Sequence, residues 1–163
     1  MFARLIAFAG AALILAACSS STPDPNAGGP LAGGPGGGAG APRFGPGSQQ
    51  DLAATAGDRI FFAYDSSEIS PEAQQILQRQ SQWLRRYPNV SVTIEGHCDE
   101  RGTREYNLAL GERRAQTVKN VLVALGTPAG RISTISYGKE RPEIPHSDDT
   151  SYAQNRRGVT TVN

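Results

Sequence analysis

A long run of glycine and proline sets the first limit on how this chain can fold. From residue 27 to residue 47, 14 of 21 positions are Gly or Pro, so this stretch cannot bury apolar surface and is predicted to be disordered. We therefore expect one folded domain, over residues 57–163, which is enough chain for a modest core. Residues 18–56 are predicted to form a tether, and composition alone leaves open whether the length of that tether matters.

Residues 1–17 are typical of a secretory signal peptide. Arg4 precedes an apolar run that would span about 20 Å as a helix, too little for a bilayer core of roughly 30 Å. Leu-Ala-Ala-Cys then resembles the lipobox of bacterial lipoproteins, which predicts lipidation of Cys18. An ordinary signal peptide followed by a chance cysteine is the alternative, and the small residues before Cys18 and the serines after it disfavour that reading. Several acyl chains would hold the protein on a bilayer, and Ser19 in place of Asp is similar to the outer-membrane sorting choice.

Strand and helix patterns alternate through the predicted domain. Strands are expected at residues 59–64, 90–95, 131–137 and 158–162, and helices at 70–87, 104–125 and 148–155. The first helix begins with Ser70 as N-cap and Pro71 at its first position. The second helix has an apolar stripe, in which Gly111 predicts a close approach to the sheet. Its members are Leu108, Gly111, Ala115, Val118, Leu122 and Leu125.

The order β-α-β-α-β-α-β brings polar residues to one edge of the expected sheet. Strands joined by a helix run parallel to each other, so Asp65 and Asp99, which follow the first two strands, should lie at the same edge. Asn107, Leu110 and Arg114 share one helix face, and Arg114 should reach toward that edge. In this interpretation Asp99 and Arg114 are both exposed, and substituting either should leave the fold intact.

The charges at this edge suggest what could bind there. Carboxylates accept hydrogen bonds from an ammonium group, and the guanidinium groups of Arg101 and Arg114 can bind a carboxylate, so a ligand that carries both groups is expected. The whole chain has 16 basic and 15 acidic residues, which argues against a nucleic-acid-binding surface.

A cell-wall hydrolase or a metal-dependent periplasmic enzyme is a competing interpretation, because His97, Cys98, Asp99 and Glu100 follow one another and could suggest a thiol nucleophile or a metal site. Successive side chains of a strand point to opposite faces, so His97 and Cys98 cannot form a catalytic dyad. His146 is the only other histidine, and the sequence has no paired spacing of metal ligands. We therefore expect no enzyme, no metal and no cofactor, and we expect Cys98 to be a buried small side chain. A lipoprotein that contacts only other proteins is a third alternative.

Several segments together resemble a known family. GHCDERGTREYNLALGERRAQTVKNVL, with FFAYD before it and SYGKERP and AQNRRG after it, is similar to the OmpA-like peptidoglycan-binding domain, specifically that of the peptidoglycan-associated lipoproteins of the Tol-Pal system. The resemblance runs from about residue 58 to residue 162 and includes the lipobox and the tether. It implies a single α+β domain with a mixed four-stranded sheet and helices packed mainly on one face.

The resemblance also implies a function and partners. The family binds peptidoglycan non-covalently at the meso-diaminopimelate of the stem peptide, which links the outer membrane to the cell wall in envelope integrity and division. Asp99 and Arg114 match the family residues for the ammonium and a carboxylate, followed by the set Asp65, Tyr64, Arg101, Asn107 and Leu110. TolB and other Tol-Pal proteins are implied as partners, with the domain in the periplasm and the lipid in the outer membrane.

Overall fold

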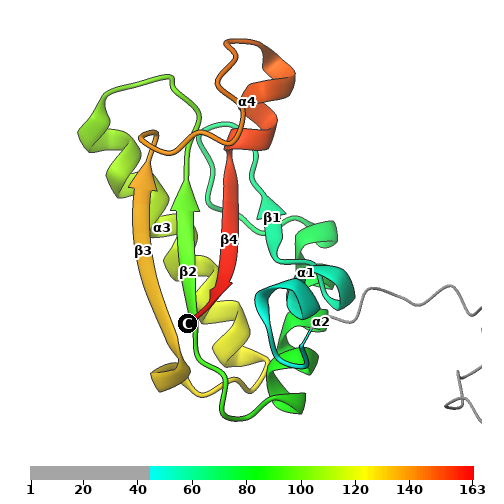
Figure 1. Cartoon of the computed structure of the whole chain (residues 1–163). Helices are drawn as coiled ribbons and strands as arrows, with labels where there is room; N and C mark the ends of the chain where they lie inside the picture. The colour runs from blue at the N-terminus through cyan, green and yellow to red at the C-terminus, as the bar shows by residue number, and fades with distance from the viewer. Residues whose placement is uncertain (1–44) are drawn as a thin grey trace, which may run out of the picture. The chain divides into compact units, whose positions relative to one another are not determined.

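The computed structural model describes residues 45–163 and contains helices on one side of a sheet (Figure 1). Its elements are α1 (Gln49–Thr55), β1 (Arg59–Phe61), α2 (Pro71–Arg86), β2 (Val92–His97), α3 (Arg104–Ala124), the 3₁₀ helix η1 (Ala129–Arg131), β3 (Ile132–Gly138), α4 (Asp149–Asn155) and β4 (Arg157–Val162). The predicted signal peptide, Cys18 and most of the Gly/Pro-rich stretch lie outside the described residues. No helix within residues 45–163 is both long and apolar enough to cross a membrane.

The four strands form a mixed sheet in the order β1-β4-β2-β3. Strand β4 is antiparallel to both of its neighbours, whereas β2 and β3 are parallel. Strands β1 and β2 therefore run in the same direction although β4 lies between them, and their carboxyl ends meet at one end of the sheet. The predicted α+β class and mixed four-stranded sheet are confirmed.

Local sequence signals explain the start of α2 and the burial pattern of β2. The Ser70 hydroxyl accepts a hydrogen bond from the Ala73 N–H at 3.2 Å, and Pro71 opens α2 as predicted. In β2, Val92 and Ile94 are completely buried while the residues between them are partly exposed, as the alternating pattern requires. Strand β1 is shorter than predicted and ends at Phe61.

Helix α3 lies against β2 and β3, with α2 beside it and α4 at the upper end of the sheet in Figure 1. A Cβ on Gly96 would lie 1.9 Å from the Gly111 carbonyl oxygen, so helix and strand touch backbone to backbone. The predicted close approach at Gly111 is thus confirmed. It holds the part of α3 around Gly111 against the carboxyl end of β2.

The apolar stripe predicted for α3 is wrong in its first turns. Leu108 is 37% exposed, whereas Asn107, Leu110 and Arg114 are buried. The apolar spacing assumed that the whole helix faces an apolar core, but only its second half does so, where Val118 and Leu122 pack.

The folded part of the chain begins before residue 57. Helix α1 lies within the segment assigned to the tether, and its Leu52 is completely buried in the core. Ser48 caps α1, and the Gln49 side chain accepts from the Val162 N–H at 2.7 Å, so α1 is fixed to the end of β4. The prediction missed α1 because a single leucine after a Gly/Pro-rich stretch gives no periodic signal.

Candidate ligand-binding site

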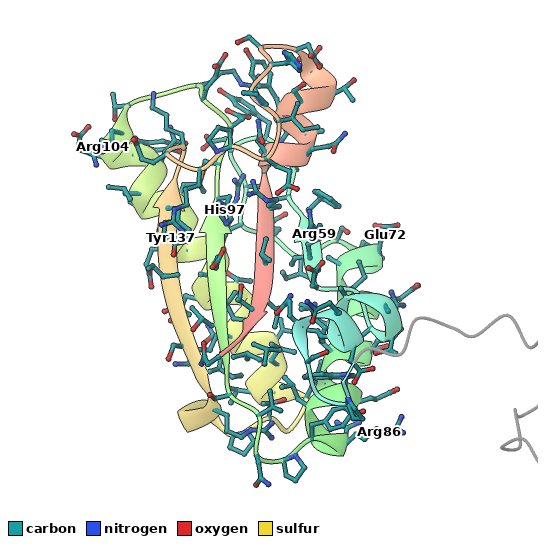
Figure 2. All side chains as sticks on the ribbon, viewed as in Figure 1. Arg59, Glu72, Arg86, His97, Arg104 and Tyr137 are labelled. Atoms are coloured by element: carbon teal, nitrogen blue, oxygen red, sulfur yellow. The ribbon has the colours of Figure 1, made fainter. Side chains whose placement is uncertain are left out.

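A hollow of about 240 Å³ lies where the carboxyl ends of β1 and β2 meet the first turns of α3. Figure 2 shows this end of the molecule, with His97 toward the end of β2 and Arg104 at the start of α3. The hollow brings together all seven residues predicted from the sequence, together with four others. Its lining is Tyr64, Asp65, Cys98, Asp99, Arg101, Gly102, Tyr106, Asn107, Leu110, Arg114 and Arg156.

Asp99 is the central acidic group of the hollow, and it is only 4% exposed. Its carboxylate accepts hydrogen bonds from Nε and Nη2 of Arg101 at 3.2 and 2.5 Å, and from Nη1 of Arg156 at 3.3 Å. Burial raises the pKa of Asp99, but the hydrogen bonds from Arg101 and Arg156 outweigh it and hold the pKa below its usual value. Asp99 is therefore ionised, and its predicted exposure is wrong because two arginines cover it.

Arg114 is completely buried, so the exposure predicted for it is also wrong. Its guanidinium donates to the carbonyl oxygens of Ser66 at 2.8 Å, His97 at 2.8 Å and Ala63 at 3.1 Å. It also lies 5.0 Å from the centroid of the Phe62 ring. Arg114 thus ties the segment after β1 to the end of β2, and it forms a fixed basic wall of the hollow.

Arg101 bonds to Asp99 from a more exposed position. Its guanidinium carbon lies 4.2 Å from the ring centroid of Tyr64 and 4.5 Å from that of Tyr152, so it is stacked on two aromatic rings. The Arg101 side chain is 37% exposed, whereas that of Arg156 is 15% exposed and also donates to the Phe62 carbonyl at 3.1 Å. Of the two arginines on Asp99, Arg101 is the more exposed.

Asp65 closes the hollow from the end of β1. It has a φ of 50°, in the left-handed region, and one carboxylate oxygen accepts from the Tyr106 hydroxyl. That hydrogen bond raises the pKa of Tyr106. Asp65 is exposed, so its carboxylate is accessible to a ligand.

In the same lining, Asn107 holds a loop in place and Leu110 supplies apolar surface. The buried Asn107 amide donates to the carbonyls of Arg101 at 2.8 Å and Thr103 at 3.0 Å, which fixes the loop between β2 and α3. Leu110 is 5% exposed and supplies an apolar part of the wall.

The sequence did not indicate Arg156 and Tyr106, which line this hollow, or Tyr152, which lies outside the lining and stacks on Arg101. Arg156 belongs to the AQNRRG segment, but its contact with Asp99 depends on the turn between α4 and β4 reaching the end of β2, which is a long-range feature. Tyr106 lies one position before Asn107, on a helix whose predicted face did not include it.

The hollow suits a zwitterionic group. Its lining carries the carboxylates Asp65 and Asp99 and three guanidinium groups, so it offers hydrogen-bond acceptors for an ammonium and forked donors for a carboxylate.

The side chains of His97 and Cys98 contact different groups. The His97 ring lies against Glu95 and Tyr137, whereas Cys98 Sγ contacts the Asn107 carbonyl and Arg114. Within residues 45–163, no three His, Cys, Asp or Glu side chains lie together in a way that could hold a metal ion. Cys98 is buried as predicted, and burial raises the pKa of its thiol.

Comparisons with known proteins place these observations in context. A family model described as OmpA family matches residues 61–156. The chain is 54% identical over 151 residues to the peptidoglycan-associated lipoprotein of Agrobacterium fabrum, covering 93% of this chain and 82% of the relative. It is 40% identical to that of Pasteurella multocida, covering 96% of this chain and 95% of the relative.

Solved structures have the same fold. The peptidoglycan-associated lipoprotein from Burkholderia pseudomallei is 39% identical with a TM-score of 0.63, covering 65% of this chain and 90% of that chain. The C-terminal domain of Helicobacter pylori MotB has a TM-score of 0.61 at 22% identity, covering 65% of this chain and 84% of that chain, and at that identity it shows a shared fold alone.

Proposed function

Because the chain belongs to the OmpA family and is similar to peptidoglycan-associated lipoproteins along nearly all of its length, we propose that it is an outer-membrane lipoprotein that binds peptidoglycan non-covalently. The names of these relatives say that they associate with peptidoglycan. The hollow at the ends of β1 and β2 supplies the matching chemistry.

The observation that carries the proposal is the buried, ionised Asp99 among arginines in an open hollow. In this proposal the ligand is the diaminopimelate of the stem peptide, whose side chain ends in an ammonium and a carboxylate. The hollow holds three guanidinium groups and two carboxylates, a net charge of +1. A zwitterion leaves this charge unchanged, whereas the lysine side chain of another peptidoglycan type would add an uncompensated positive charge, so diaminopimelate is preferred.

Binding begins with an exchange of partners at Asp99. The ligand ammonium approaches the exposed carboxylate of Asp65 and competes with Arg101 for Asp99. Arg156 keeps its hydrogen bond to Asp99, because its own position is fixed at Phe62. The released Arg101 remains stacked between the two tyrosine rings and binds the ligand carboxylate as a bidentate fork.

The same geometry favours binding over catalysis. A general acid must carry a proton at the working pH, and the arginines on Asp99 keep it ionised. Release of soluble muropeptides by the purified protein would contradict this part of the proposal.

Co-sedimentation with purified sacculi tests the proposed ligand. The full-length protein should sediment with diaminopimelate-type sacculi at least about tenfold more efficiently than with lysine-type sacculi. Asp65→Asn should weaken the first interaction by roughly tenfold, because it removes a charge while Asn tolerates the left-handed backbone. The exposed Glu105→Gln on α3 is the control and should sediment like the wild type. Equal sedimentation with both types of sacculi would overturn the assignment of diaminopimelate.

The anchor and the partners complete the proposal. A lipid on Cys18 would hold the domain to the outer membrane through the Gly/Pro-rich tether, so that binding links two envelope layers. The Tol-Pal system is the proposed setting, with TolB binding a surface that overlaps the hollow and a role in envelope integrity and division. Cys18→Ser should move the protein from the membrane fraction to the periplasm or leave it as precursor. Unchanged fractionation with the outer membrane would contradict the lipid anchor.

A further inference from the structure

A second hollow, of about 360 Å³, lies beside the first one. The segment between β3 and α4 forms one side of it, and Figure 1 shows this segment passing close to α4 at the upper end of the sheet. Its lining combines charged, aromatic and apolar groups: Glu100, Lys139, Glu140, Pro142, Ile144, Pro145, His146, Tyr152 and Asn155.

Tyr152 and the loop after β2 separate the two hollows. Arg101 lines the first hollow and the preceding residue, Glu100, lines the second. The Tyr152 ring stacks on Arg101, and its hydroxyl donates to Glu100 Oε1 at 2.7 Å. The two hollows therefore adjoin, with Arg101 on one side and Glu100 and Tyr152 on the other.

Two sets of hydrogen bonds hold the walls of the second hollow in place. Lys139 Nζ donates to the carbonyls of Glu100 at 3.0 Å and Gly102 at 2.7 Å, which joins the two loops. Asn155 is only 4% exposed, and its side chain accepts from the N–H groups of Glu143 and Ile144 at 2.8 and 3.0 Å. The hollow is thus formed before any ligand arrives, which lowers the entropy lost on binding.

The lining favours a neutral polar ligand. Its charges are balanced, because Lys139 lies with Glu100 and Glu140, and Arg104 Nε lies 3.3 Å from Glu140 Oε1, so an uncharged ligand leaves no unpaired charge there. Glu100, Glu140 and Lys139 can accept from or donate to hydroxyl and amide groups, while Pro142, Pro145 and Ile144 offer apolar surface. Hydroxyl groups, an amide and a methyl are together the features of an N-acetylated sugar.

We propose that this second hollow binds the N-acetylated sugar that carries the stem peptide. The inference rests on the proposed function, because it places diaminopimelate in the first hollow. Diaminopimelate is the third residue of the stem, so only two residues separate it from the sugar. The two hollows adjoin at the consecutive residues Glu100 and Arg101, so both parts of the ligand have a place close to each other.

Titration calorimetry with two probes tests the inference on the full-length protein. One probe is the diaminopimelate-containing tripeptide, and the other is the same tripeptide attached to its disaccharide. The wild type should bind the second probe roughly fivefold to tenfold more tightly, as expected for one or two additional net hydrogen bonds. The double variant Glu140→Ala with His146→Ala should lose this advantage and keep its affinity for the tripeptide, since neither residue lines the first hollow.

Glu105→Ala, an exposed change outside both hollows, is the control and should behave as the wild type. Equal affinity of the wild type for the two probes would overturn the sugar site and leave the proposed function standing. The same holds if the double variant weakens the binding of both probes equally. Failure of the wild type to bind either probe would overturn the proposed function itself.

Discussion

The two halves of helix α3 bury different kinds of side chain against the same sheet. In the second half, Ala115, Val118 and Leu122 are at most 1% exposed and pack in the apolar core. In the first half, Asn107 and Arg114 are just as buried, but each is hydrogen-bonded to backbone carbonyls. Burial in this domain therefore does not by itself identify the apolar core.

The second half of α3 contributes mainly to stability, and the first half contributes mainly to the binding site. Burying a leucine contributes about 1.5–3 kcal/mol to folding, whereas the desolvation of a buried arginine offsets much of what its hydrogen bonds contribute. The apolar half thus supplies net stability, and the polar half uses its hydrogen bonds to hold a binding site in one geometry.

The largest expected effect comes from removing the buried arginine of the polar half. Arg114→Ala should lower the free energy of unfolding by about 4 kcal/mol, because it leaves the carbonyls of Ala63, Ser66 and His97 without their partner. Urea denaturation of the full chain measures this change. The exposed neighbour is the matched control, and Arg113→Ala should cost less than about 0.5 kcal/mol. Similar losses from both variants would show that Arg114 does not tie the two segments together.

A smaller effect concerns pH and involves His97, a β2 residue that the polar half of α3 contacts through Arg114. Burial, followed by the charge of Arg157, lowers the pKa of His97, whose carbonyl accepts from Arg114. The unfolded chain then binds more protons as the pH falls below the unfolded value of about 6.5, so the free energy of unfolding should fall, by less than about 1.4 kcal/mol per pH unit. Below the lowered folded pKa the loss should level off.

Denaturant unfolding at about pH 7.5 and about pH 5.5 measures this slope. His97→Gln should flatten it, because the group that gains a proton on unfolding is gone. If the variant keeps the slope of the wild type, other groups are responsible for it.

Sequence patterns predicted those parts of the fold that depend on local chemistry. The Ser70 cap, the alternation in β2 and the close approach at Gly111 are each readable from a few neighbouring residues. The shared edge of Asp65 and Asp99 followed from the parallel direction of strands joined by helices.

The rest depends on contacts between distant segments. No local pattern indicates that β4 inserts between β1 and β2, and this insertion brings Arg156 to Asp99. Exposure was wrongly predicted for Asp99 and Arg114 because charged residues usually lie at the surface, and their burial depends on partners from the segment after β1, the end of β2 with its following loop, and the turn before β4.

The most direct test of the account is titration calorimetry with the diaminopimelate-containing tripeptide on two variants, one at Asp99 in the site that the polar half of α3 lines and one in the apolar half. Asp99→Asn should weaken binding at least about tenfold, because it removes the buried charge that receives the ammonium. Leu122→Ala should destabilise the protein by about 3 kcal/mol and, while folded, bind like the wild type. The opposite pattern, with binding unchanged in Asp99→Asn, would contradict the assignment of the site to the polar half of α3.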